Sequence, residues 1–167
     1  MMLGCEPASD VSYDDEGDSS SESTSTSTTS DTSSQTSSEA SHGFDYGSIS
    51  WGGEGYSGAT TVDMTLNSVS VSGSTISFSY EMNDSWPEES GAQAIACAFM
   101  KQGDGSWYGG KFDWIRSGGQ SSKTTENIEG GYGAFSGHAP SSGQEMAFVW
   151  VSVDGTRRSN AAFCTWP

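Results

Sequence analysis

The sequence Val69-Ser-Val-Ser-Gly73-Ser-Thr-Ile-Ser-Phe-Ser-Tyr80 decides the fold class. Apolar residues alternate with serine on both sides of the glycine, which is the period of a β-strand with one buried and one solvent-exposed face. Gly73 can adopt the positive φ angle that a tight turn requires. The stretch therefore predicts two antiparallel strands joined as a β-hairpin.

Short strand-like runs separated by turn residues continue along the rest of the chain after residue 46. Asp104-Gly105 and Asp154-Gly155 are two further hairpin signals, and no segment shows a sustained helical period. We expect strands near 47–51, 60–71, 74–82, 93–101, 106–115, 122–128, 145–153 and 159–166. Many short strands with glycine-rich turns predict an all-β domain over residues 47–167, a β-sandwich or jelly-roll-like double sheet.

Three of these runs are expected to form the core. The run 93–100 has Ile95, Cys97 and Phe99 on one face and small alanines on the other, which indicates a strand buried on both sides. The runs 145–153 and 160–167 are similarly apolar. Three tryptophans are assigned to this core, namely Trp114, Trp150 and Trp166.

Residues 1–46 have a different composition. Eighteen of the twenty-three residues from Ser19 to Ser41 are serine or threonine, and residues 1–46 contain ten acidic and no basic residues. Such a segment cannot bury enough apolar surface to offset its chain entropy. We therefore predict a disordered, acidic, low-complexity tail over residues 1–46 that acts as a flexible linker to the domain.

The charge of the chain limits its partners. Twenty-two acidic residues against six basic ones give a net charge of −16, which excludes nucleic acid and anionic membrane surfaces as electrostatically recruited partners. No run approaches the roughly 18 apolar residues that a membrane-spanning helix needs. Contact with a membrane would therefore require a lipid anchor.

The three cysteines divide into one in the tail and two in strand-like runs. Cys97 and Cys164 both occupy inward positions of apolar strands, and we expect a disulfide between them. The alternative is that both are reduced and act as small buried hydrophobic residues.

The N-terminal residues Met1-Met-Leu-Gly-Cys5 resemble the end of a bacterial lipoprotein signal, in which the cysteine becomes the lipidated first residue. In such lipoproteins a polar linker often separates the anchor from a folded module. The resemblance implies lipidation at Cys5 and an exported protein of the bacterial cell envelope or cell surface. A free cysteine in the tail is the alternative.

A second resemblance covers roughly residues 80–167. The segments that carry it are Trp107 with Lys111-Phe-Asp-Trp-Ile-Arg116, Gly131-Tyr132-Gly133, Arg158-Ser-Asn160 and Thr165-Trp-Pro167. Together they resemble small exported β-sandwich domains of bacteria that lack an assigned activity. The resemblance supports the fold class and implies no catalytic residue.

Aromatic residues are numerous for so small a domain, which suggests that some are exposed. Tryptophan and tyrosine rings match the apolar faces of sugars, so the surplus favours carbohydrate binding. The candidates lie in glycine-rich or polar segments: Trp51, Tyr56, Trp86, Trp107, Tyr108 and Tyr132. Asp113, Arg116 and Arg158 could add polar contacts, the alternative being that Asp113 is a partly buried carboxylate paired with Arg158 or Lys111.

Other chemistry has weaker support. Asn83, Asp84, Glu88 and Glu89 place hard oxygen ligands in one loop, so calcium is possible there, although such runs are more often solvated. No other cofactor is indicated. The carboxylates show no diagnostic glycosidase spacing, and there is neither a Gly-x-Ser-x-Gly motif nor a histidine pair suited to a metal site.

The sequence thus favours an envelope-tethered, non-catalytic binding module whose best single ligand class is an extracellular glycan. A structural or protein-interaction domain that docks another envelope protein is the main alternative. A glycan-active enzyme is the third reading.

Overall fold

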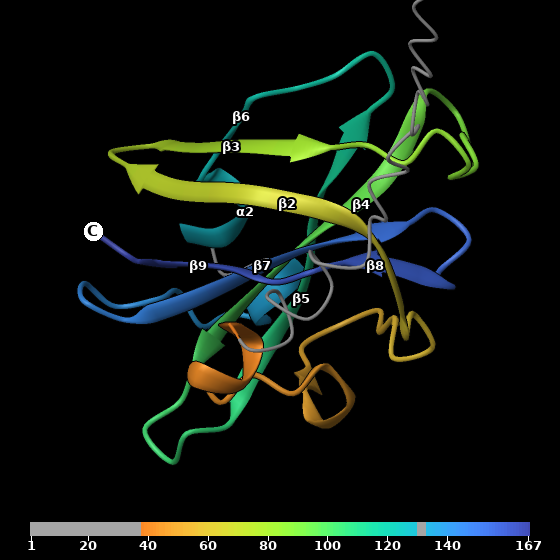
Figure 1. Ribbon diagram of the computed structural model, residues 1–167. Helices are drawn as coiled ribbons and strands as arrows, with labels where there is room; N and C mark the ends of the chain where they lie inside the picture. The colour runs from red at the N-terminus through yellow and green to blue at the C-terminus, as the bar shows by residue number, and fades with distance from the viewer. Residues whose placement is uncertain (1–37, 130–132) are drawn as a thin grey trace, which may run out of the picture.

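The computed structural model describes residues 38–129 and 133–167. These residues form an all-β domain, as the sequence predicts, with only short helical segments (Figure 1). The strands are β1 (Ser50–Trp51), β2 (Thr61–Ser72), β3 (Thr75–Glu81), β4 (Ala92–Lys101), β5 (Trp107–Arg116), β6 (Ser122–Thr124), β7 (Glu145–Ser152), β8 (Arg157–Ser159) and β9 (Ala162–Thr165). The helical segments are η1 (Tyr46–Ser48), α2 (Glu126–Glu129) and η2 (Gly133–Phe135), and residues 38–41 are helical as well.

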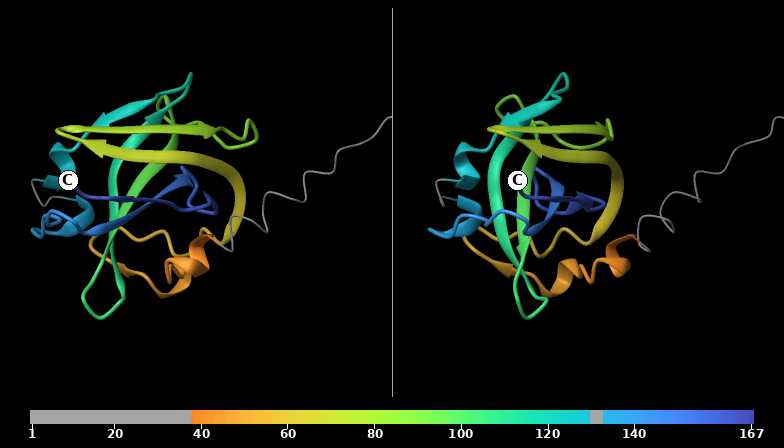
Figure 2. Two further views of the ribbon diagram at one scale, coloured as in Figure 1. Left: turned by 60° about the vertical axis from the view of Figure 1, so that its left-hand side comes forward. Right: turned by 90° about the vertical axis from the view of Figure 1, so that its left-hand side faces the viewer.

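The strands belong to one mixed sheet in the order β1-β5-β4-β7-β8-β2-β3-β6, and β9 pairs with β7. The pairs β1–β5 and β2–β8 are parallel, whereas the other pairs are antiparallel. The sheet curls, so that β2 and β3 lie over β4, β5 and β7 (Figures 1 and 2). The two layers pack face to face as in a sandwich, but they are joined through the β2–β8 pair.

The predicted central strand is confirmed, because β4 is buried on both faces. On the inner face its alanines pack with residues of β2 and β3 such as Leu66 and Phe78, and with Trp150 of β7. On the outer face Ile95, Cys97 and Phe99 belong to a second hydrophobic cluster. Each face of this strand therefore needs its own covering layer.

The hairpin predicted for residues 69–80 is present. β2 and β3 pair from Thr65↔Glu81 to Ser72↔Thr75, and Gly73 has φ 54° in the turn. Ile76 and Phe78 are buried, while the serines of the other face are exposed and two of them, Ser68 and Ser79, share a hydrogen bond of 2.8 Å. Gly105 and Gly155 also have positive φ at the two other predicted turns.

The covering layer of the outer face begins with residues 38–48, which we call the strap. It lies below the sheet in Figure 1, in orange. Phe44 and Tyr46 are each 4% exposed, and burying two such side chains contributes about 1.5–3 kcal/mol each. The predicted boundary at residue 47 therefore needs correction, because residues 38–46 are part of the folded domain. The rest of the predicted tail, including Cys5, lies outside the described residues.

A buried ion pair fixes the start of the strap. Both Glu39 carboxylate oxygens accept hydrogen bonds from the guanidinium of Arg158 on β8, at 2.8 and 3.0 Å, and Oε1 also accepts from the Ala161 amide at 2.8 Å. The guanidinium carbon lies 4.6 Å from the ring centroid of Tyr46. Arg158 thus holds the strap, and it also lines a cavity of about 330 Å³ together with Glu39, Phe44 and Tyr46.

A second contact fixes the middle of the strap. His42 Nδ1 lies 2.5 Å from Glu145 Oε1, and Lys101 Nζ donates to Glu145 Oε2 at 2.9 Å. The His42 ring stacks on Phe163 with centroids 3.9 Å apart. Burial alone would raise the pKa of the Glu145 carboxyl, but the hydrogen bonds from His42 and Lys101 outweigh it and hold that pKa below its usual value.

The predicted disulfide is wrong, since Cys97 and Cys164 are both free. β7 lies between their strands, where Cys97 is opposite Val149 and Cys164 is opposite Met146. Partners three residues apart on one strand face opposite sides of a sheet, and two strand spacings of about 4.8 Å already exceed the Cα separation of about 7 Å that a disulfide allows. Burial raises the pKa of the Cys97 thiol, and it raises that of Cys164 to about 11.

Candidate functional site

A β-bulge in β5 determines which side chains reach the outer surface of the sheet. In the β4–β5 pair, Ile95 is opposite Trp114 and Cys97 is opposite Lys111, so β5 has one extra residue in this interval. Trp114 and Lys111 therefore share the outer face although they are three positions apart. Phe112 and Ile115, also three apart, both enter the inner core.

Trp114 is the exposed large apolar side chain of the described residues, at 37% exposure. The strap and the residues that follow it cover the outer face around Ile95, Cys97 and Phe99, but they do not cover Trp114. The prediction that Trp114 belongs to the core is therefore wrong, whereas Trp150 and Trp166 are buried as expected.

Trp114 lines a surface cavity of about 380 Å³ together with Glu89, Ser90, Ala92 and Arg116. Arg116 is on the same strand, Glu89 and Ser90 come from the turn that leads into β4, and Ala92 is the first residue of β4. The cavity therefore combines a flat aromatic surface with a carboxylate and a guanidinium. We call it the Trp114 cavity.

One wall of the Trp114 cavity is a strained two-residue turn. The amides and carbonyls of Glu89 and Ala92 exchange two hydrogen bonds of 2.9 Å, and the residues between them, Ser90 and Gly91, have φ 54° and 75°. A left-handed serine costs about 1–3 kcal/mol, and such residues concentrate at functional sites. Arg116 Nη1 donates to the Ser90 carbonyl at 3.3 Å, which ties the turn to β5.

Arg116 differs from the other basic residues of the chain, all of which lie in the described part. The other five each have a carboxylate within 4.0 Å: Lys101 with Glu145, Lys111 with Glu54, Lys123 with Asp113, Arg157 with Asp63 and Arg158 with Glu39. Arg116 is exposed and has no such partner among the described residues. Its charge is available to a ligand in the cavity.

Lys111 lies against the ring of Trp114. Its Nζ lies 4.0 Å from the ring centroid of Trp114 and 3.7 Å from Glu54 Oε2. Burial, with a smaller contribution from Glu54, raises the pKa of the Tyr56 hydroxyl above its usual value. Because Lys111 does not line the cavity, a ligand there would contact indole surface that Lys111 leaves open.

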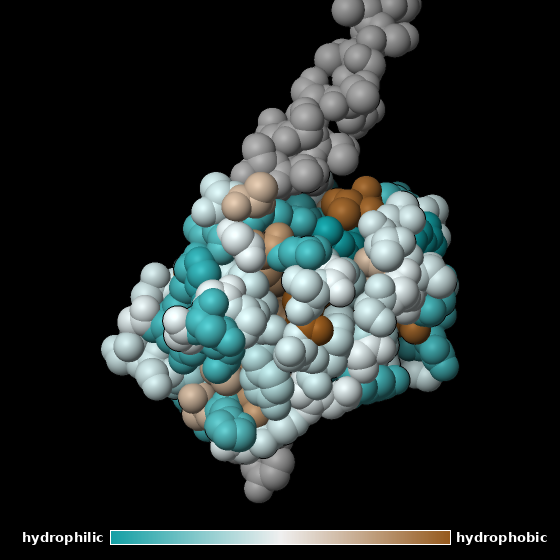
Figure 3. Space-filling model, turned by 90° about the horizontal axis from the view of Figure 1, so that it is seen from below, coloured by the Kyte–Doolittle hydropathy of each residue, from teal (hydrophilic) through white to brown (hydrophobic). Residues whose placement is uncertain are grey.

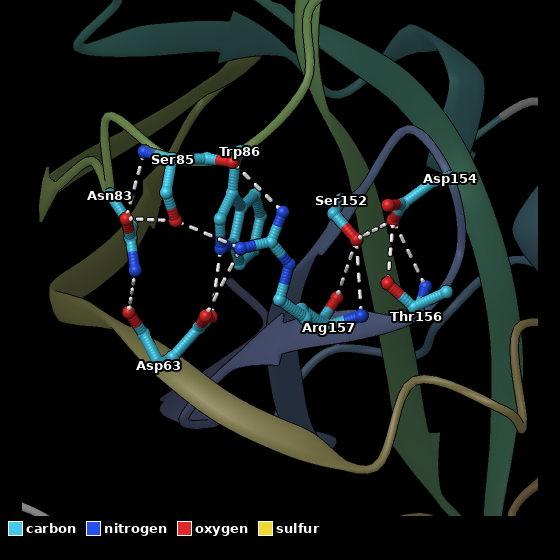
Figure 4. A network of polar contacts seen from close by, with 8 residues as sticks. All are labelled: Asp63, Asn83, Ser85, Trp86, Ser152, Asp154, Thr156 and Arg157. Atoms are coloured by element: carbon cyan, nitrogen blue, oxygen red, sulfur yellow. Dashed lines mark hydrogen bonds and ion pairs between the residues drawn. The ribbon is translucent and has the colours of Figure 1, made fainter.

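Two of the predicted ligand-binding tryptophans are buried. Trp86 and Trp107 are each 3% exposed. The Trp86 indole donates to Asp63 Oδ1 at 2.8 Å within a network that includes Arg157 (Figure 4), and the Trp107 indole donates to the Gly43 carbonyl of the strap at 3.0 Å. Each indole N–H has an acceptor, so both rings can be buried without an unsatisfied donor.

Of the remaining predicted site residues, Trp51 and Tyr56 pack edge to face with ring centroids 6.0 Å apart, but neither lines the Trp114 cavity. Trp51, Tyr56 and Tyr108 are half-buried, and Tyr132 lies outside the described residues. Asp113 pairs with Lys123 at 3.3 Å, not with Arg158 or Lys111 as the alternative proposed. Of the three charged candidates, Arg116 alone lines the Trp114 cavity.

Hydrogen bonds of Asn83 shape the possible calcium loop. The Asn83 side chain accepts from the amide and hydroxyl of Ser85 at 3.0 and 2.7 Å, and it donates to the Asp63 carbonyl at 2.9 Å (Figure 4). Asp84 and Glu88 are exposed, and Glu89 lines the Trp114 cavity. Within residues 38–129 and 133–167 no three acidic, histidine or cysteine side chains gather as metal ligands.

Comparisons with known proteins find no match among family models, curated proteins or solved structures. No helix in the described part of the chain is both long and apolar enough to cross a membrane. The Trp114 cavity is therefore interpreted from its own chemistry.

Proposed function

We propose that the domain is a non-catalytic carbohydrate-binding module that binds its ligand in the Trp114 cavity. The observation that carries the proposal is an exposed tryptophan in a cavity of about 380 Å³ that also contains Glu89 and Arg116. An indole stacks on the C–H face of a sugar ring. The carboxylate can accept hydrogen bonds from hydroxyl groups, and the guanidinium can donate to ring or hydroxyl oxygens.

The residues that line the cavity favour binding over hydrolysis. Glycosidases place two carboxylic side chains on either side of the scissile bond, about 5–9.5 Å apart. Glu89 is the single carboxylate among the described residues that line the Trp114 cavity. A bound sugar would therefore meet one carboxylate there and no second one to act as an acid or base.

The protein-docking alternative has less support, because side chains cap the free edge of β5. Asn127 donates to the Phe112 carbonyl at 3.0 Å, and the amides of Trp114 and Arg116 donate to the side chains of Asp113 and Gln120 at 2.7 and 2.8 Å. Capped edges resist strand addition. On the face shown in Figure 3, hydrophobic atoms form only small separate spots, which does not favour a broad apolar interface there.

We place this module at the bacterial cell envelope, linked through residue Cys5 and the Ser/Thr-rich segment. The support is the Gly4-Cys5 sequence and the composition of residues 19–41. A polar linker would hold the domain away from its anchor and give the cavity access to extracellular glycans.

A glycan array probed with the purified domain tests the proposal. Wild-type protein should bind at least one class of glycan, Trp114→Ala should lose that binding, and Trp114→Phe should retain part of it because it keeps an aromatic ring. Because Trp114 is exposed, circular dichroism and the urea midpoint should change little in either variant. Absence of binding above background would overturn the proposed function, and unchanged binding by Trp114→Ala would overturn the site.

A further inference from the structure

Arg116 indicates the charge of the ligand. It is the basic residue of the described chain that has no carboxylate partner, and it lies beside the exposed Trp114. From Ser38 onward the chain has fourteen acidic residues against six basic ones. An exposed arginine that remains unpaired among so many carboxylates is available for an anionic group from outside.

We propose that the ligand of the Trp114 cavity is a glycan with a carboxylated sugar unit, whose ring stacks on Trp114 while its carboxylate pairs with Arg116. This inference rests on the proposed function and names the ligand class of the same site. A planar guanidinium matches the two oxygens of a carboxylate in a forked pair of hydrogen bonds. A neutral sugar would leave that charge without a partner.

The surroundings of Arg116 hold it ready for such a contact. Its main-chain amide donates to Gln120 Oε1 at 2.8 Å, and its Nη1 donates to the Ser90 carbonyl at 3.3 Å. No other hydrogen bond of this guanidinium occurs among the described residues. The strained turn at Ser90 therefore orients the guanidinium without neutralising it.

Glu89 determines which way round the sugar binds in the cavity. It lines the same cavity but lies more than 4.0 Å from Arg116, since the two form no ion pair. Its carboxylate repels the sugar carboxylate and accepts hydrogen bonds from hydroxyl groups. The acidic end of the sugar would therefore lie toward Arg116 and the hydroxyl-bearing end toward Glu89.

The overall charge limits how many carboxylates the glycan can carry. The acidic excess of the domain creates a negative field that repels densely charged polymers. The structure therefore favours a glycan in which a carboxylated unit stands among neutral ones, and it disfavours a polyanion.

The test compares glycans that differ in the carboxylate alone. The array glycan that binds most strongly is prepared in its native form and with its carboxyl groups reduced to alcohols, and both are titrated against the wild-type domain. The native form should bind about fivefold more tightly, the effect of one partly exposed charge-assisted contact. Arg116→Gln should remove this difference, and Arg116→Lys should keep part of it because the charge remains without the fork.

Lys123→Gln is the matched control, since it removes one positive charge from the domain outside the cavity and should leave the preference intact. If the strongest array ligands are neutral, or if carboxyl reduction or Arg116→Gln leaves their affinity unchanged, the carboxylate inference is overturned while glycan binding stands. If no glycan binds, both proposals fail.

Discussion

Replacing Glu39 by alanine should destabilise the domain strongly, although sequence composition places this residue in a flexible tail. Glu39 is 8% exposed, and its two oxygens accept three hydrogen bonds, two from Arg158 and one from the amide of Ala161. The alanine variant leaves a buried guanidinium without its counterion and a buried amide without its acceptor. Loss of one partner of a buried ion pair costs about 3–5 kcal/mol.

The strap sets an upper limit to this cost. If it detached, Arg158 would regain water, but Phe44 and Tyr46 would be exposed and would lose about 1.5–3 kcal/mol each. Detachment is therefore about as costly as keeping the unpaired charge, and the expected loss remains near 3–5 kcal/mol. That is a large part of the 5–15 kcal/mol by which typical domains are stable.

Urea unfolding followed by tryptophan fluorescence measures the loss. Glu88→Ala is the control, because Glu88 is exposed and its removal should change the free energy of unfolding by less than about 0.5 kcal/mol. The double variant Glu39→Ala/Arg158→Met should be more stable than Glu39→Ala alone, since no unpaired charge remains buried. A loss below about 1 kcal/mol in Glu39→Ala would refute the assignment of the strap to the folded domain.

Two further predictions concern acid and oxidation. The pKa of Glu145 is lower in the folded than in the unfolded chain. Its contribution to stability is therefore complete above the unfolded pKa of about 4.3 and is lost as the pH falls from there through the folded pKa. In that acid range, NMR should show faster exchange of the Trp107 indole proton, which is bonded to the strap, and Glu145→Gln should make this exchange less dependent on pH. Cys97 and Cys164 are free thiols, so both should react with a thiol reagent after denaturation without reductant. If the thermal unfolding midpoint fell when reductant was added, the two cysteines would be bridged and this prediction would be wrong.

The fold was predictable where local signals agree with tertiary packing. Alternation and turn residues in the 69–80 stretch predict the observed hairpin. A strand with one solvent-exposed face has alternating polar and apolar side chains wherever it lies in the fold. The run predicted over 122–128 ends earlier, as β6 followed by the helical turn α2. The strap was missed because composition averages over a window, and the Ser/Thr-rich stretch masks Glu39, Phe44 and Tyr46, whose partners are distant in sequence.

The tryptophans show most clearly why the site could not be read from the sequence. Polar neighbours of Trp86 and glycines after Trp107 suggest exposure, but each indole has an acceptor from a segment far away, Asp63 and Gly43 respectively. Trp114, between Phe112 and Ile115 in the predicted strand 106–115, looks like a core residue, but the extra residue in β5 turns it outward. Removing that bulge would reverse the faces of all side chains beyond it and bury Trp114 at the cost of exposing Ile115. The same backbone irregularity therefore completes the inner core and creates the candidate binding surface, which is why a tryptophan that the sequence assigns to the core faces solvent.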